Sequence, residues 1–132
     1  MQLGSDAVIE TLELIKTEKV TTTIQNSATE EKTAYKLNKE NCKIEWTMKA
    51  SKVYNMIRGL SPYPGAHCFL VHKKETLKII IYSSKIEIET HQLDSGLIII
   101  EKKQIKIATK DGFLIPQEIK VQGKKSMKIS DL

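Results

Sequence analysis

The stretch that decides the fold runs from residue 43 to residue 66 and reads KIEWTMKASKVYNMIRGLSPYPGA. Its middle part places Val53, Ile57 and Leu60 at helical spacing, so these side chains share one face of a predicted amphipathic helix. Pro62 follows shortly after the last apolar residue, which is typical of a helix end. The segment therefore predicts one helix with an apolar face, followed by a Pro-rich corner.

After this corner the periodicity changes to that of β-strands, in Ile-rich segments separated by turn residues. In residues 86–89 and 105–107 apolar and charged residues alternate, as expected for a sheet with one buried face. We expect a mainly β domain with helices (α+β), namely a small OB-like β-barrel with one packed helix. The predicted strands are His67–Val71, Leu77–Tyr82, Lys85–Glu89, Gly96–Glu101, Gln104–Ala108 and Phe113–Val121.

The chain before this domain is organised differently. Residues 5–17 predict an isolated helix with Ser5 as its N-cap. From residue 20 to residue 41 apolar periodicity is absent, which indicates a linker. We therefore predict a terminal helix in 1–18, a linker in 19–41 and an OB-like domain in 42–132. The apolar face of the helix consists of Val8, Ile9, Leu12 and Ile15.

The whole chain has a net charge of +5. Its positive charge is concentrated in the second part of the sequence. Residues 1–40 contain five lysines against seven acids, whereas residues 41–132 contain 16 Lys and Arg against nine acids. Such a field attracts polyanions, of which nucleic acid is the commonest in the cytoplasm. A basic surface that only aids solubility is the alternative on charge alone.

Other sequence features argue against secretion, membrane insertion and a metal site. No secretion signal and no apolar run of membrane-spanning length is recognisable, so we expect a soluble cytoplasmic protein without a membrane partner. Cys42 and Cys68 lack metal-ligand spacing and are expected to be reduced packing residues. His67, His72 and His91 have no readable catalytic partner. No catalytic, cofactor-binding or metal-binding residue is predicted.

The stretch quoted above resembles the hallmark segment of methionyl-tRNA formyltransferase C-terminal domains. In that family an I-D/E-W-S strand end leads into a helix that closes with I-R-A-L-N-P-W-P-G-A. Residues 108–112 (ATKDG) and 122–127 (QGKKSM) are similar to the family's A-T-G-D-G turn and G-K-K-x-M end. Residues 4–15 and 34–37 are similar to the last helix of the family's catalytic domain and to its linker. The resemblance covers nearly the whole chain.

This resemblance implies the C-terminal part of an enzyme that acts in translation initiation. The parent enzyme would transfer a formyl group from 10-formyltetrahydrofolate to methionyl-initiator tRNA. The family's catalytic residues lie in an upstream domain that nothing here matches, so the fragment should be inactive alone. Its expected partners are the tRNA and the catalytic domain of the same polypeptide. Two alternatives stay open, a related formyltransferase that acts on another substrate and a free-standing RNA-binding barrel.

Basic residues are the candidate tRNA contacts, because Lys and Arg hold phosphates without reading sequence. Lys49 stands where the family often has a Ser helix cap, and this unfavourable choice leads to the hypothesis that Lys49 and Lys52 face phosphate. Trp46, Tyr54 and Tyr63 are expected to pack the helix onto the barrel rather than to stack on bases. The candidates are Arg58, Lys49, Lys52, Lys73, Lys74, Lys102, Lys103, Lys106, Lys124, Lys125 and Lys128.

Overall fold

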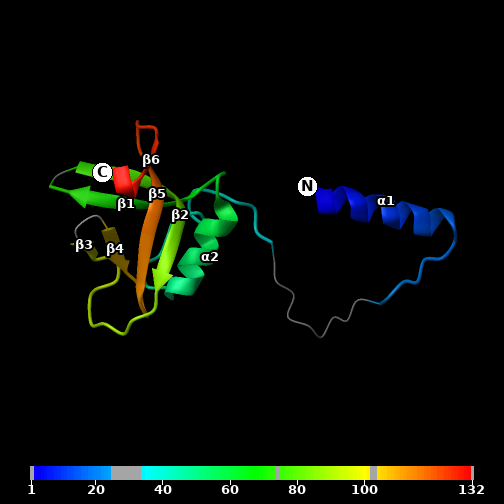
Figure 1. Ribbon diagram of the computed structural model, residues 1–132, viewed down its shortest axis with the longest axis horizontal. Helices are drawn as coiled ribbons and strands as arrows, with labels where there is room; N and C mark the ends of the chain where they lie inside the picture. Colours follow the sequence, from blue (N-terminus) through cyan, green and yellow to red (C-terminus); the bar gives the residue numbers. More distant parts are fainter. Residues whose placement is uncertain (1, 25–33, 74, 102–103, 132) are drawn as a thin grey trace. The chain divides into compact units, whose positions relative to one another are not determined.

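The computed structural model describes residues 2–24, 34–73, 75–101 and 104–131, and it forms two compact units, residues 1–35 and 36–132. The first unit contains α1 (Gln2–Lys16), and the second begins with α2 (Ala50–Leu60) and ends with a 3-10 helix, η1 (Ile129–Asp131) (Figure 1). The strands of the second unit are β1 (Ala66–His72), β2 (Glu75–Glu87), β3 (Ile98–Glu101), β4 (Gln104–Ala108), β5 (Phe113–Val121) and β6 (Ser126–Lys128).

Helix α1 begins earlier than the sequence predicts. Its first residue is Gln2, so Ser5 lies inside the helix and the prediction that Ser5 is the N-cap is wrong. The Ser5 hydroxyl donates a 2.8 Å hydrogen bond to the carbonyl oxygen of Gln2, a bond to the preceding turn that helical serines often make. The residues of the predicted apolar face are all more than half exposed. They are Val8, Ile9, Leu12 and Ile15.

The described parts of the predicted linker, residues 19–24 and 34–41, contain neither helix nor strand. A pair of asparagines orders the end of this segment. The backbone N–H of Asn38 donates to Asn41 Oδ1, and the backbone N–H of Asn41 donates to Asn38 Oδ1, each at 2.8 Å. These reciprocal bonds fix the chain just before the domain, while the division into helix, linker and domain stays a prediction.

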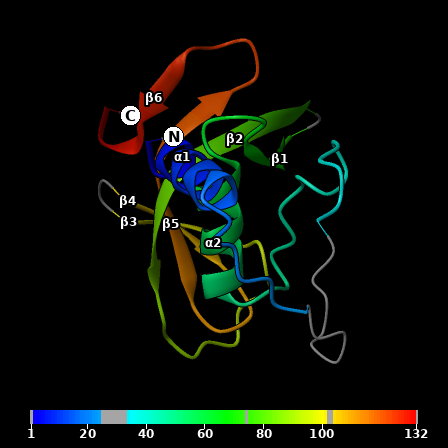
Figure 2. The same cartoon turned by 90° about the vertical axis from the view of Figure 1, so that its right-hand side faces the viewer.

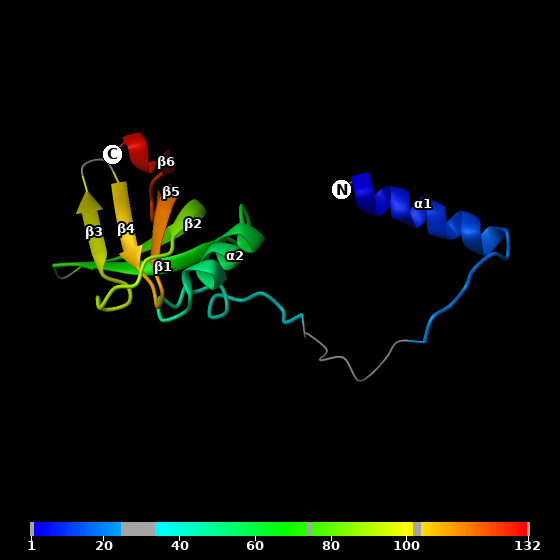
Figure 3. The same ribbon diagram turned by 60° about the horizontal axis from the view of Figure 1, so that its bottom comes forward.

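The strands of the second unit form an antiparallel sheet in the order β1-β2-β5-β4-β3, with β6 added to β5 (Figure 3). This arrangement confirms the α+β class. In the described part of the chain no ladder joins β1 to β3, so the OB-like barrel is open along this line. An apolar cavity of about 680 Å³ is lined by residues from β1 to β5.

Strand β2 joins two segments that the sequence predicts as separate strands, residues 77–82 and 85–89. Its pairing with β5 shifts register between Ile81 and Ser84. A β-bulge of this kind bends a strand without ending it. Because residues 82–84 contain no Gly, Pro or Asn, nothing in the local sequence forces a turn. The predicted break is therefore wrong, and the chain continues through a bulge.

Strand β6 was not predicted, because three residues are too few to show a periodic pattern. It pairs with β5 through Glu118 opposite Lys128 and Ile119 opposite Met127. The β5–β6 hairpin and the C-terminus lie at the same end of the domain (Figure 2). This pairing gives the basic tail of the chain a fixed place on the sheet.

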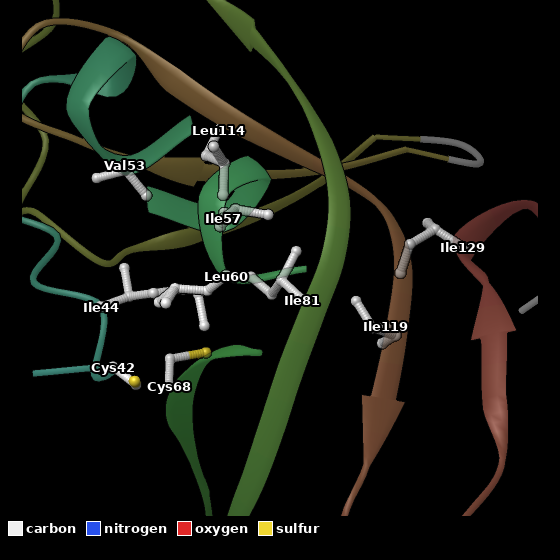
Figure 4. Close-up of a cluster of buried hydrophobic side chains, with 11 residues drawn as sticks. Cys42, Ile44, Val53, Ile57, Leu60, Cys68, Ile81, Leu114, Ile119 and Ile129 are labelled. Carbon is white, nitrogen blue, oxygen red and sulfur yellow. The ribbon is translucent and has the colours of Figure 1, made fainter. Parts of the chain in front are cut away.

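The core lies between α2 and the sheet, where side chains from distant segments meet (Figure 4). Ile57 of α2 and Ile81 of β2 are each only 1% exposed, and Leu114 of β5 is fully buried. Full burial of one such side chain contributes about 1.5 to 3 kcal/mol to folding. The same cluster includes Cys42, Ile44, Val53, Leu60, Ala66, Cys68, Ile119 and Ile129.

The N-terminus of α2 is capped from a distant turn rather than by its own N-cap residue. Lys49 makes no side-chain cap, but Asp111 Oδ1 accepts a 2.8 Å hydrogen bond from the backbone N–H of Ala50. The neighbouring Lys110 N–H donates to the carbonyl oxygen of Met48 at 3.1 Å. The expected loss of a side-chain cap at Lys49 is confirmed, but the ATKDG turn supplies a different acceptor for the helix start.

The same turn requires glycine at residue 112. A Cβ atom there would collide with the carbonyl oxygen of Glu87 and would lie 3.0 Å from Ile88 Cα. The Gly112 carbonyl oxygen also accepts hydrogen bonds from the hydroxyl and the backbone N–H of the buried Thr109, at 2.7 and 2.8 Å. The turn is thus packed between the end of β2 and the start of α2, which gives residues 108–112 a structural role.

Loss of this cap should destabilise the domain. We expect Asp111→Ala to lower the free energy of unfolding by about 1 kcal/mol, because Ala50 N–H loses its acceptor. Urea titration followed by circular dichroism measures the change. The control is Asp94→Ala at an exposed acid of the loop before β3, which should stay within about 0.5 kcal/mol of the wild type. Equal stability of the two variants would contradict the capping role.

Candidate nucleic-acid interface

Helix α2 separates its apolar side from its basic side. Val53 and Ile57 are buried in the core, whereas Lys49, Lys52 and Arg58 are exposed. Within the described residues no ion pair involves any of these three cations. They are therefore available to an anionic partner, as the sequence-based hypothesis requires.

A small pocket lies beside Arg58, between α2 and β2. It has a volume of about 270 Å³, and its walls include Tyr54 and Ser61 on one side and Tyr82 and Ser84 on the other. Ser84 Oγ is buried and has no hydrogen-bond partner among the described residues. Guanidinium and hydroxyl groups around one hollow suit the oxygen atoms of a phosphate.

A second basic group lies at the C-terminal end of the domain. Lys124 and Lys125 are exposed in the turn between β5 and β6, and Lys128 is exposed on β6. Lys128 also lines a pocket of about 480 Å³ together with Lys85, although Glu118 contributes a negative charge there. This group extends the positive charge of the sequence motif onto the neighbouring strand.

The remaining candidates differ in what the structure says of them. Lys73 is exposed in the β1–β2 turn, where its φ angle of 55° is in the left-handed region. Lys74, Lys102 and Lys103 lie outside the described residues. For these four lysines, as for the other candidates, the proposed phosphate contact stays a prediction.

Among the candidates that the structure describes, Lys106 is the least available to an anion. Its Nζ lies 3.0 Å from Glu87 Oε2 and 3.7 Å from Glu101 Oε2, and 5.6 Å from the centre of the Phe113 ring. The hydrogen bond to Glu87, with smaller effects from the charges of Glu101 and Glu89, raises the pKa of Lys106. Two carboxylates already neutralise this ammonium group, so we rank it last among the candidates.

The structure places the described basic candidates mainly on two parts of the domain, α2 with its N-cap and the β5–β6 hairpin, and we treat these as two basic groups. The pocket at Arg58 contains residues of α2 and β2, and the pocket at Lys128 contains residues of β2, β4, β5 and the C-terminal end. Neither of these two pockets is lined by cations from both groups. An extended RNA backbone is the kind of ligand that reaches several such groups at once.

The aromatic residues of the hallmark segment do not share one role. Trp46 and Tyr54 are partly buried and pack against the core, as predicted. Tyr63 is 89% exposed, so the prediction that it packs the helix onto the barrel is wrong. It lies at the rim of a further pocket that contains Lys39 and Lys78. No sequence signal pointed to these two lysines, because neither belongs to a motif.

His91, Cys42 and Cys68 make contacts that belong to the packing of the domain. His91 Nε2 lies 3.0 Å from the Gly112 carbonyl oxygen, and its ring packs against Phe113. Cys42 and Cys68 are free and buried, as predicted, and burial raises the pKa of Cys68 to about 11. The His72 side chain lies outside the described set.

The described residues offer neither a metal site nor a membrane span. No group of three or more His, Cys, Asp and Glu side chains among them has an arrangement that would hold a metal ion. No helix in the same residues combines the length and the apolar character needed to cross a membrane.

The pattern of motif and fold corresponds to a known family. The family model described as "Formyl transferase, C-terminal domain" matches residues 36–132. The chain belongs to this family. The match begins just before the turn of Asn38 and Asn41 and includes both basic groups and the whole sheet.

This formyl transferase C-terminal domain is also similar in sequence to complete proteins of known name. The chain is 51% identical over its full length to a methionyl-tRNA formyltransferase of Flavobacterium johnsoniae. It is 38% identical over its full length to a methionyl-tRNA formyltransferase of Bacteroides thetaiotaomicron. In both comparisons the chain spans 42% of the length of the curated relative.

Solved structures of HypX from Aquifex aeolicus have a similar fold. One variant matches 93% of this chain and 22% of the HypX chain, with a TM-score of 0.56 and 19% sequence identity. The HypX complex with tetrahydrofolic acid matches with the same TM-score and identity. At this level of identity the likeness extends to the fold alone.

The buried His67 should make stability depend on pH. Burial, with smaller effects from Lys78 and Lys43, lowers the pKa of His67 below 6.5. As the pH falls, the His67 side chain is therefore protonated in the unfolded chain before it is protonated in the folded domain. The stability that the neutral His67 side chain contributes is complete above pH 6.5 and is lost as the pH falls toward the folded pKa. The loss cannot exceed about 1.4 kcal/mol per pH unit.

Urea titrations at a series of pH values, on the wild type and on His67→Gln, measure this effect. The variant cannot take up the proton, so the difference in stability between the two proteins should shrink as the solution is made more acidic. Parallel pH profiles would contradict the prediction, whatever the stability of the variant at neutral pH.

Proposed function

We propose that the chain is the tRNA-contacting C-terminal part of a methionyl-tRNA formyltransferase. The full protein would transfer a formyl group from 10-formyltetrahydrofolate to methionyl-initiator tRNA, a step of translation initiation. The observation that carries this proposal is 51% identity over the full chain to a methionyl-tRNA formyltransferase. Since the chain spans 42% of that relative, the catalytic residues would belong to the rest of such a protein.

The role of this part would be to hold and orient the tRNA. The exposed cations of α2 and those of the β5–β6 hairpin are each free of ion pairs in the described residues. Contacts from Lys and Arg to phosphate release counterions, which gives affinity and sets position without reading the base sequence. The tRNA would thereby be oriented toward a catalytic domain in the same polypeptide, and we place the protein in the cytoplasm with its substrate.

The folate does not fit the apolar cavity of this domain. The apolar cavity inside the open barrel is lined by aliphatic and aromatic side chains from β1 to β5, together with Cys68. A pterin ring has a hydrogen-bonding edge, and ligand sites for such groups place polar atoms opposite them. We therefore assign the formyl donor to the part of the enzyme outside this chain and derive no chemical step from the domain itself.

The proposal predicts tRNA binding that weakens steeply with salt. We expect a dissociation constant on the order of micromolar to sub-millimolar near physiological salt, with little distinction between initiator and elongator tRNA, because phosphate contacts dominate. Fluorescence anisotropy with labelled tRNA over a range of salt concentrations gives the slope of log K against log salt. Absence of binding, or binding unaffected by salt, would overturn the proposal.

Variants of lysines with and without ion pairs test which charges contribute to tRNA binding. Lys124→Gln/Lys125→Gln should weaken tRNA binding and reduce the salt slope by about two, one for each ammonium group removed from a phosphate. Lys106→Gln is the matched control, because Glu87 and Glu101 already neutralise that ammonium group, and its slope should stay unchanged. A larger effect at Lys106 than at the lysine pair would contradict this assignment.

A further inference from the structure

A polar pocket lies where the end of the linker meets β1. Its volume is about 210 Å³, and its walls come from three segments that are distant in sequence. One wall comes from the end of the linker, and the Pro-rich corner 63–65 forms another. The first wall consists of Leu37, Asn38, Lys39 and Cys42. His67 of β1 and Lys78 of β2 complete the pocket. All of these residues belong to the second compact unit.

Backbone hydrogen bonds hold the linker wall against β1. The His67 N–H donates to the Cys42 carbonyl oxygen at 3.0 Å, and the Ile44 N–H donates to the His67 carbonyl oxygen at 2.8 Å. The reciprocal bonds between Asn38 and Asn41 fix the turn beside it. These hydrogen bonds hold the walls of the pocket in fixed positions.

The pocket is cationic. Lys39 and Lys78 line it, and Lys43 is near enough to lower the pKa of His67. No carboxylate is among the described residues of its lining. His67 is only 5% exposed, and its ring packs edge-on against Phe69. A site with two lysines and an imidazole suits the oxygens of a phosphate.

The rim of the pocket adds an aromatic platform. Tyr63 is 89% exposed, so packing within the domain does not explain its place. Its neighbour Pro64 and the following Gly65 both line the pocket. An exposed aromatic ring beside cations is the arrangement on which unpaired bases stack while the backbone phosphate is held by charge.

We propose that this pocket binds one nucleotide of an unpaired RNA segment, with the base stacked on Tyr63 and the phosphate held by Lys39 and Lys78. The inference rests on the RNA-binding function proposed above and names a contact that is separate from α2 and from the β5–β6 hairpin. A base inside a duplex is not accessible to such stacking, so the pocket takes a single-stranded nucleotide.

Amide and aromatic NMR spectra of the full 132-residue chain test this, with a short single-stranded oligoadenylate as the probe. The oligoadenylate should shift the amide signals of Gly65, His67 and Lys78 and should move the Tyr63 ring signals upfield. Tyr63→Ala should weaken binding by about fivefold or more, the size of one base stack, and Lys78→Gln should weaken it as well. Tyr63→Phe should retain most of the affinity.

The matched controls are Tyr35→Ala and Lys110→Gln. Tyr35 is 77% exposed and Lys110 is exposed, and neither lines the pocket, so both variants should bind the oligoadenylate as the wild type does. Circular dichroism shows whether each variant is folded. Unchanged binding by Tyr63→Ala would overturn the inference, as would equal affinity for inorganic phosphate alone, which would reveal an anion site without base stacking.

Binding of tRNA to the same proteins separates this inference from the proposed function. Salt-dependent tRNA binding together with no response of the pocket to oligoadenylate would leave the proposed function standing and would remove the pocket from it. A pocket that binds oligoadenylate in a protein that does not bind tRNA would overturn the proposed function and not the nucleotide site.

Discussion

The domain depends on the burial of one side of α2 against β2 and β5. Ile57 of the helix, Ile81 of β2 and Leu114 of β5 are almost completely inaccessible to solvent, and together they join three segments that are distant in the sequence. Because adjacent helical residues point about 100° apart, the burial of Ile57 turns Arg58 outward. The same contact therefore builds the core and determines which cations of the helix face solvent. Asp111 fixes the start of this helix through the Ala50 N–H, in addition to the packing of Ile57.

Local pattern was enough to predict most elements of the domain. Helix α2 follows from the spacing of Val53, Ile57 and Leu60, and the alternation of Ile and charged residues predicts the strands, because both depend on which side of an element is buried. The bulge in β2 and the cap from Asp111 could not be predicted in this way. Both arise from contacts between segments far apart in the chain, which no local periodicity records.

In the candidate site, too, local sequence predicts one part, and contacts between segments determine the rest. The sequence identifies every lysine, but it does not say which lysines already have partners. In the β3–β4 ladder Glu101 lies opposite Gln104 and Lys106 lies opposite Ile99, so Glu101 and Lys106 are diagonal neighbours, and the register itself produces one of the ion pairs. Tyr63 is the converse case. Its neighbours in the motif are structural, yet the corner leaves the ring in solvent beside lysines that belong to no motif.

The burial of both cysteines has a consequence for experiments on local opening of the domain. Cys42 belongs to the segment that hydrogen-bonds to β1, and Cys68 follows His67 on that strand. With a pKa of about 11 and little access to solvent, Cys68 resists alkylation in the folded domain. The rate at which a thiol reagent modifies the folded protein therefore reports how often the structure around the two cysteines opens, without any label added to the chain.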